Sequence, residues 1–314
     1  MESNKILMKE KLEFSGIIKE AFAIPYKNLN FIIFALLSAL PLFLSMLVHE
    51  IYFLKTLTLS AKLSYNQFSS CHRFYCILHP FITFLRSTKI GYHDLVFLGL
   101  FYLSILYIID LLNTIMIVNA SSLLYAGARV STLKDMLSRP INMSTLKGPL
   151  ITSFYALALA LLSSLGLVSL ATQFYVFPPA VLLFFALFVK YMEWSAVWNM
   201  GIVISILEEN KIGDIAIGVS AYVSKGRRRL GFLLNLVFFL WRYGLRFLCL
   251  YFWWVGNHIA IRVTIWCVGL ACLGTSMKWV LFMVYFYDCK IRSLEKKVDI
   301  EEARVAELLK KYAT

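Results

Sequence analysis

Six long blocks of mainly apolar residues divide this sequence, and they constrain its fold more than any other feature. Each block has about twenty or more residues, enough for a helix rising about 1.5 Å per residue to cross a bilayer core of about 30 Å. Of the 314 residues, 60% are hydrophobic and 16% are charged, whereas soluble domains carry about a quarter charged residues. We therefore predict an all-α integral membrane protein with six transmembrane helices. The predicted spans are Leu29–Leu54, Leu95–Val118, Pro149–Leu170, Phe177–Leu207, Gly231–Leu250 and Val263–Tyr287.

Lysine and arginine are distributed unevenly between the two sides of the predicted membrane. Of the 31 basic residues, 21 lie in segment 1–28, the second and fourth loops and segment 288–314, and only six lie in the other loops. Because cytosolic segments carry the excess of Lys and Arg, both termini are predicted to be cytosolic. Asn119 and Asn142 begin N-glycosylation motifs, which this orientation predicts to stay unmodified. The expected location is a secretory-pathway membrane, either the endoplasmic reticulum or the plasma membrane.

The formal net charge of +13 indicates which partners the chain prefers. In a nucleic-acid-binding protein the basic residues form a solvated face on a soluble fold. Here they lie between apolar blocks, an arrangement that favours anionic membrane lipids instead. We expect membrane lipids as partners, with other membrane proteins as a further class and no nucleic acid.

Three parts are predicted: a cytosolic amphipathic arm (1–28), a membrane domain (29–287) and a cytosolic helical tail (288–314). The arm fits a helix that ends at Pro25 and lies in the interface. The tail spaces apolar residues in near-heptad order, which suits either a partner helix or packing on the protein itself. The predicted apolar stripe of the arm contains Leu7, Phe14, Ile18, Ala21 and Phe22, and that of the tail contains Ile291, Leu294, Val298, Val305 and Leu308.

The segment between the fourth and fifth spans is a polar run between two long apolar blocks. Asp214 is predicted to cap a short interfacial helix, and Gly226 to follow its end. The run 227–229 of three arginines is expected to hold the next span at the anionic leaflet. For Glu208, the expected basic partner is Lys225 or Arg228. The predicted apolar face of this helix consists of Ile215, Ala216, Val219, Tyr222 and Val223.

Charged side chains also occur inside the predicted spans, where a lone charge costs several kcal/mol. They should therefore face inward and pair, as Lys190 and Glu193 can on one helix face. One interpretation is a polar site for an anionic ligand or an ion. The other is a structural network that joins the spans, helped by Asn113, Asn199 and Asn235. The candidates are Asp110, Lys190, Glu193, Arg242, Arg246 and Lys278, of which Asp110, Lys190, Glu193 and Lys278 are expected near mid-bilayer.

The first loop contains soft and imidazole side chains that zinc prefers, namely Cys71, His72, Cys76 and His79. Their spacing matches no standard zinc motif, and a disulfide between the two cysteines or two unpaired thiols are equal alternatives. We therefore predict no metal and no cofactor. The motifs HExxH, GxSxG and GxxxxGK[ST] are absent, so no enzymatic activity is expected.

Three patches of the sequence resemble a known family. They are EAFAIPYKNLNFIIFALL, SSLLYAGARVSTLKDMLS and EWSAVWNMGIVISILEENKIGDIAIGVSAYVSKG. The chain resembles a plant family of uncharacterised six-span transmembrane proteins, some labelled polyadenylate-binding-protein-binding protein. The third patch is also distantly similar to the membrane domain of bacterial glycerophosphoryl diester phosphodiesterases. In that motif the matching residues are Trp194, Trp198, Glu208, Gly213, Ala216, Ser220, Lys225 and Gly226.

The resemblance implies the fold and membrane residence, but not hydrolase activity, because the phosphodiesterase barrel is absent. We expect a non-enzymatic multi-pass membrane protein that acts through lipids or other membrane proteins. The alternative is a small transporter or channel that uses the intramembrane charges.

Overall fold

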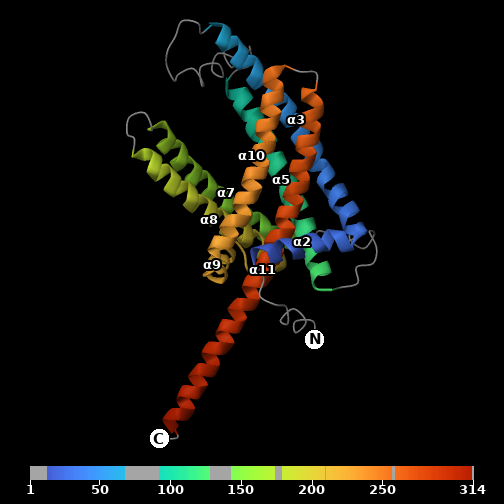
Figure 1. Ribbon diagram of the computed structural model, residues 1–314. Coiled ribbons are helices and arrows are strands. Elements are labelled where there is room, and N and C mark those ends of the chain that lie inside the picture. Colours follow the sequence, from blue (N-terminus) through green and yellow to red (C-terminus); the bar gives the residue numbers. More distant parts are fainter. Residues whose placement is uncertain are drawn as a thin grey trace. The chain divides into compact units, whose positions relative to one another are not determined.

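The computed structural model describes residues 13–67, 92–127, 143–173, 179–208, 210–256 and 259–312, and every regular element within them is a helix (Figure 1). A long helix covers nearly all of each predicted apolar block, as expected where a bilayer leaves backbone groups no partner outside the helix. The helices are α2 (Phe14–Lys27), α3 (Leu29–Gln67), α5 (Tyr92–Tyr125), α7 (Met143–Thr172), α8 (Ala180–Leu207), α9 (Asp214–Val223), α10 (Arg228–Val255) and α11 (Ala260–Tyr312).

Six of these helices are long and apolar enough to cross a membrane, which confirms the predicted all-α, six-span class. The apolar segments are Leu29–Lys55, Tyr102–Tyr125, Leu146–Thr172, Ala180–Leu207, Arg228–Val255 and Ala260–Glu295. The second ends seven residues later than predicted, at Tyr125 instead of Val118. The last belongs to one unbroken helix, α11, which runs on to Tyr312. No Gly or Pro follows Gly274 to interrupt it, so the predicted tail continues the last span as helix. The side chains beyond Glu295 lie outside the described part, and the heptad pattern stays a prediction.

The chain divides into two compact units. Unit 1 consists of segments 1–35, 114–238 and 277–314, and unit 2 of segments 36–113 and 239–276. In unit 1, one apolar core joins residues of α2, α8 and α9 to the stretch Trp279–Phe286 of α11. Unit 2 has two smaller cores, one around Leu42, Val268 and Cys272 and the other around Leu54, Cys249 and Cys267.

Helix α2 is part of the core of unit 1, although its buried face differs from the predicted stripe. Ile17, Ala21 and Ile24 are buried, whereas Phe22 is 54% exposed. The helix also continues past Pro25 to Lys27, because Pro25 loses only its own N–H bond and its carbonyl accepts from the backbone of Asn28. The prediction that Pro25 ends this helix was therefore wrong.

The helices α7 and α8 form the predicted antiparallel hairpin, and they lie side by side in Figure 1. Gly166 permits close contact, since a Cβ there would be 3.5 Å from Leu187. Outside this contact the hairpin exposes large apolar side chains, such as Leu162 on α7 and Leu182 on α8. Exposed leucines along helices of this length indicate contact with lipid.

Candidate functional site: the charge junction of α8, α9, α10 and α11

Gly213 sets the direction in which the chain leaves the fourth span. It occupies the N-cap of α9 with a φ of 65°, a conformation that glycine adopts without steric cost. Its N–H donates to Oγ1 of Thr152 on α7 at 2.8 Å. Asp214 is the first residue of α9 and is exposed, so the prediction that it caps the helix was wrong. Its carboxylate still lies at the positive end of the helix dipole.

Helix α9 folds back along α8 and contacts it through small residues. A Cβ on Gly201 would lie 3.3 Å from the Cα of Ile217, and the hydroxyl of Ser220 donates to the carbonyl of Val197 at 2.7 Å. Small side chains permit backbones to approach this closely. Gly226, with a φ of 97°, follows the end of α9 as predicted.

The predicted apolar face of α9 is only partly correct. Ala216 is fully buried, but Ile215 is 58% exposed and Tyr222 is 61% exposed. The buried face follows Ala216 and Ser220, because only small side chains fit against α8. The larger apolar side chains therefore lie on the outside of this helix.

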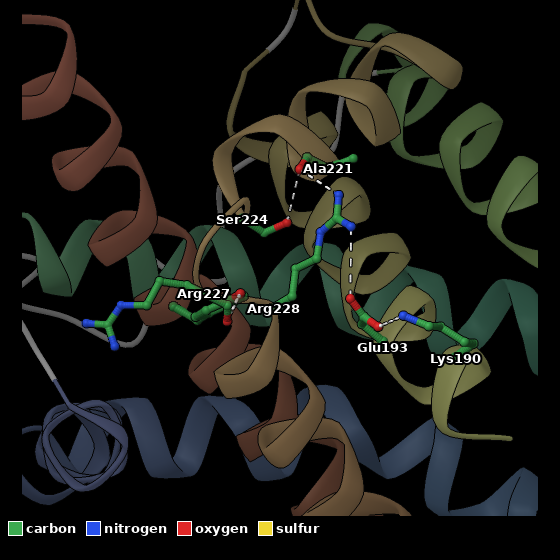
Figure 2. A network of polar contacts seen from close by, with 7 residues as sticks. Lys190, Glu193, Ala221, Ser224, Arg227 and Arg228 are labelled. Atoms are coloured by element: carbon green, nitrogen blue, oxygen red, sulfur yellow. Dashed lines mark hydrogen bonds and ion pairs between the residues drawn. The ribbon is translucent and has the colours of Figure 1, made fainter. Parts of the chain in front are cut away.

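Glu193 is the first of three carboxylates that each lie between two basic side chains. It accepts a hydrogen bond from Lys190 at 2.9 Å and lies 3.9 Å from the guanidinium of Arg228, the first residue of α10. Figure 2 shows Glu193 between these two residues, with Arg228 also reaching the carbonyl of Ala221 at 3.4 Å. The guanidinium of Arg228 lies 5.5 Å from the ring centroid of Trp194. Arg228 therefore connects the beginning of α10 to α8 and to α9 through its side chain.

Glu208 is the second carboxylate, and it immediately follows α8. It accepts from Lys211 at 2.5 Å and from Lys290 of α11 at 2.6 Å. The partners predicted for Glu208 were therefore wrong, since Arg228 contacts Glu193 instead and Lys225 is exposed. Lys290 is far from Glu208 in sequence, and only the packing of α11 brings the two together.

Asp288 is the third carboxylate, and the sequence did not single it out. Only 4% of its side chain is exposed, and its Oδ2 lies 3.1 Å from Arg292 and 3.7 Å from Arg227. Arg227 and Arg228 point in opposite directions in Figure 2. Arg227 therefore pairs with Asp288, whereas Arg228 pairs with Glu193. The hydroxyl of Tyr285 donates to the carbonyl of Arg227 at 3.1 Å, which also holds this turn against α11.

These nine residues, which we call the charge junction, carry a surplus of positive charge. Glu193, Glu208 and Asp288 are the three acids, and the six bases are Lys190, Lys211, Arg227, Arg228, Lys290 and Arg292. The charge junction therefore has a net charge of +3. The neighbouring Lys225 and Arg229 are exposed, and within the described part of the chain their side chains have no ion pair.

The contact between Glu193 and Arg228 joins two residues that the sequence had predicted at different depths in the membrane. Glu193 lies in the middle of α8, about 21 Å along the helix from Leu207 at about 1.5 Å per residue. Arg228 begins α10. The sequence predicted Glu193 near mid-bilayer and Arg228 at the leaflet surface, but a contact of 3.9 Å between their side chains places the beginning of α10 beside the middle of α8. The second half of α8, from Ala196 to Ser205, is largely buried by protein, whereas its first half exposes Leu182, Leu183 and Phe185.

The other predicted intramembrane charges are divided between the units. In unit 1, Lys278 donates to Asn199 at 2.9 Å and lies 4.6 Å from the ring centroid of Trp279. Asn235 donates to the carbonyl of Met192 at 3.2 Å, which is a structural bond between α10 and α8. Asp110, Arg242 and Arg246 belong to unit 2, where Arg246 pairs with Glu50 at 3.2 Å. Glu50 was missed because it lies near the end of its span, where acids are common.

The predicted metal candidates Cys71, His72, Cys76 and His79 lie outside the described residues. Within the described ranges, no group of three or more His, Cys, Asp or Glu side chains is arranged to hold a metal ion.

The pKa of Glu208 gives the charge junction a predicted pH dependence. Burial alone would raise this pKa, but hydrogen bonds and attraction from Lys211 and Lys290 outweigh burial and hold it below its ordinary value of 4.5. Ionised Glu208 therefore stabilises the folded state above that value, and the contribution is lost as the pH falls through the lower, folded pKa.

We expect Glu208→Gln to lower the free energy of unfolding at pH 7 by about 0.5 to 1 kcal/mol, as for other partly exposed ion pairs. At a pH below the folded pKa, the variant and the wild type should be equally stable. Thermal unfolding in detergent across this pH range measures the difference. A gap that stays constant with pH would contradict the assigned role of Glu208.

Searches of protein-family models, curated proteins and solved structures find no match to this chain. What the sequence and the fold establish is therefore an architecture. The chain is an all-α multi-pass membrane protein with six helices able to span a bilayer.

Proposed function

We propose that this chain is a non-enzymatic membrane protein that acts through anionic lipids, which it gathers at the charge junction. The positive surplus of the junction supports this proposal most strongly. Anionic lipid head groups supply the compensating charge that the three carboxylates do not. Exposed Lys225 and Arg229 stand beside the junction and present cations to the surrounding membrane surface.

The proposal includes an orientation. The charge junction lies at the cytosolic leaflet, both termini are cytosolic, and the protein resides in a secretory-pathway membrane. The distribution of Lys and Arg supports this arrangement. The second half of α8, covered by α9 and α11, then extends the apolar core of unit 1 through the interface.

We propose that this chain belongs to the plant family that it resembles. The residues of the shared motif would then have the same structural role throughout that family. Gly213, Ser220 and Gly226 shape the return of the chain along α8, and Glu208 ties this turn to α11. A family that keeps these residues would keep the charge junction. The same geometry is proposed for the related membrane domains.

The test compares a double variant at the two exposed cations beside the charge junction with a control at an exposed lysine of α2. The full chain is purified in neutral phosphatidylcholine nanodiscs, phosphatidylserine is added, and its enrichment beside the protein is measured by native mass spectrometry. Lys225→Gln together with Arg229→Gln should lower the preference for phosphatidylserine about tenfold or more, since each cation contributes about 1 kcal/mol near an anionic surface.

Lys27→Gln in α2 is the matched control. Lys27 is also exposed, but α2 and its N-cap carry two acids, Glu13 and Glu20, against the two bases Lys19 and Lys27, so no surplus of positive charge exists there. This control should change the preference for phosphatidylserine less than twofold to threefold. Equal losses in the control and the double variant, or no loss in either, would overturn the proposal.

A further inference from the structure

A small pocket in unit 2 combines an apolar wall with three charged side chains. It has a volume of about 60 Å³ and lies among α3, α10 and α11. Its charged lining consists of Glu50, Arg242 and Arg246. The remaining lining residues are Met46, Leu245, Cys249, Cys267, Val268 and Ala271. A charged pocket among helices that span a bilayer requires an explanation, because isolated charges are costly there.

Arg246 is held in place by two contacts that leave part of its guanidinium unused. Its Nε lies 3.2 Å from Oε1 of Glu50, and its Cζ lies 5.1 Å from the ring centroid of Phe53. The carboxylate thus occupies the Nε edge and the aromatic ring occupies one face. The terminal N–H groups keep donors for a further acceptor, because a guanidinium carries five.

Arg242 lies one helical turn before Arg246 and lines the same pocket. Within the described part of the chain, no carboxylate lies within ion-pair distance of Arg242. Asp110 is not part of the pocket lining. Two arginines and one glutamate therefore leave the pocket with one surplus positive charge.

We propose that this pocket binds an oxyanion of the phosphate class, held between Arg242 and the free edge of Arg246. Planar guanidinium groups bind phosphate through paired hydrogen bonds, which suits two arginines on one helix face. The volume suits one such group, since a single water needs about 10 to 15 Å³ of the same measure. Both arginines are also exposed along α10, so the anion reaches the pocket from the lipid side or from water.

This site is independent of the charge junction, because all of its residues belong to unit 2. A phosphate of this kind comes either from an anionic phospholipid or from free phosphate in solution. Arg242→Gln removes the surplus charge and one donor pair. Because hydrogen bonds to charged groups are stronger than those between neutral groups, this variant should bind the anion about tenfold or more weakly.

The experiment uses the full chain in phosphatidylcholine nanodiscs with two probes, phosphatidylglycerol and inorganic phosphate. Native mass spectrometry counts retained phosphatidylglycerol, and a rise in melting temperature reports inorganic phosphate. Arg262→Gln is the matched control, because Arg262 is an exposed arginine of unit 2 outside the pocket. We expect Arg242→Gln to lose one tightly retained anion and Arg262→Gln to keep it.

Glu50→Gln provides a change of opposite sign. The amide oxygen of glutamine still accepts from Arg246, but the competing negative charge is gone, so anion affinity should rise several-fold. Loss restricted to phosphatidylglycerol identifies a lipid as the source, and loss of stabilisation by inorganic phosphate identifies a soluble anion. If Arg242→Gln and Glu50→Gln leave both probes unchanged, or if Arg262→Gln loses as much as Arg242→Gln, the pocket is not an anion site.

Discussion

Replacing Asp288 with asparagine will lower the free energy of unfolding by about 3 kcal/mol. Asp288 is almost fully buried and is shared by Arg227 and Arg292. Removing its charge leaves two cations in a protein core without their counter-charge, and breaking a buried ion pair typically costs about 3 to 5 kcal/mol. The lower end applies because both arginines remain about a quarter exposed. Unfolding of the purified protein in mixed micelles measures this loss.

Asp214→Asn is the matched control for this prediction. It makes the same chemical change at an exposed carboxylate in the first turn of α9. The loss there should stay below about 1 kcal/mol, which is the usual contribution of a helix-dipole interaction. If the two variants lose stability equally, Asp288 does not hold the turn that precedes α10 against α11.

Replacing Gly201 with leucine will separate α9 from α8 and lower the free energy of unfolding by about 1 to 3 kcal/mol, as other overpacked cores do. Even a Cβ at this position would lie 3.2 to 3.3 Å from atoms of Ile217, one of them the backbone Cα. A leucine side chain has no room unless α9 moves. The hydrogen bond from Ser220 to Val197 would lengthen with it.

Gly218 on α9 offers the opposite result from the same substitution. A Cβ there meets nothing within 4 Å. Gly218→Leu should therefore leave stability unchanged or raise it by up to about 1 kcal/mol, because leucine favours helix over glycine. A loss of stability at Gly218 as large as at Gly201 would show that close packing of α8 and α9 is not the cause.

The helices were predictable because a helix that crosses a bilayer needs a long apolar block, and each such block in the sequence corresponds to a spanning helix. Their ends were not, because helical hydrogen bonds continue through polar residues until a specific residue stops them. In α11, for example, Asp288 and Lys290 fall inside the helix although they follow the predicted end of the span at Tyr287.

The candidate site could be predicted only in part, for a similar reason. Contacts within a helix follow from spacing, and the ion pair of Lys190 and Glu193 was correctly expected. Contacts between helices depend on how closely the backbones approach, which is set by residues such as Gly201 and Gly213. For that reason Glu208 binds Lys290 rather than a nearer basic residue, and the burial of Asp288 gave no signal in the sequence.

A single contact changes the role that we assign to Glu193. Counted along its helix, it falls in the middle of a span. Its contact with Arg228 ties it to the beginning of α10, next to the exposed cations Lys225 and Arg229. On this basis we propose that Glu193 belongs to the membrane surface and to lipid binding, rather than to a path through the membrane.

The most direct test of this account is the labelling of an introduced thiol at Lys225 by a membrane-impermeant maleimide. Sealed vesicles with the cytosolic face outward should label Lys225→Cys rapidly above the background of the wild-type protein. Leu162→Cys on α7, which is 70% exposed but predicted to face lipid, should remain unlabelled. If Lys225→Cys reacts only after the vesicles are opened, or is as protected as Leu162→Cys, the charge junction does not lie at the cytosolic surface.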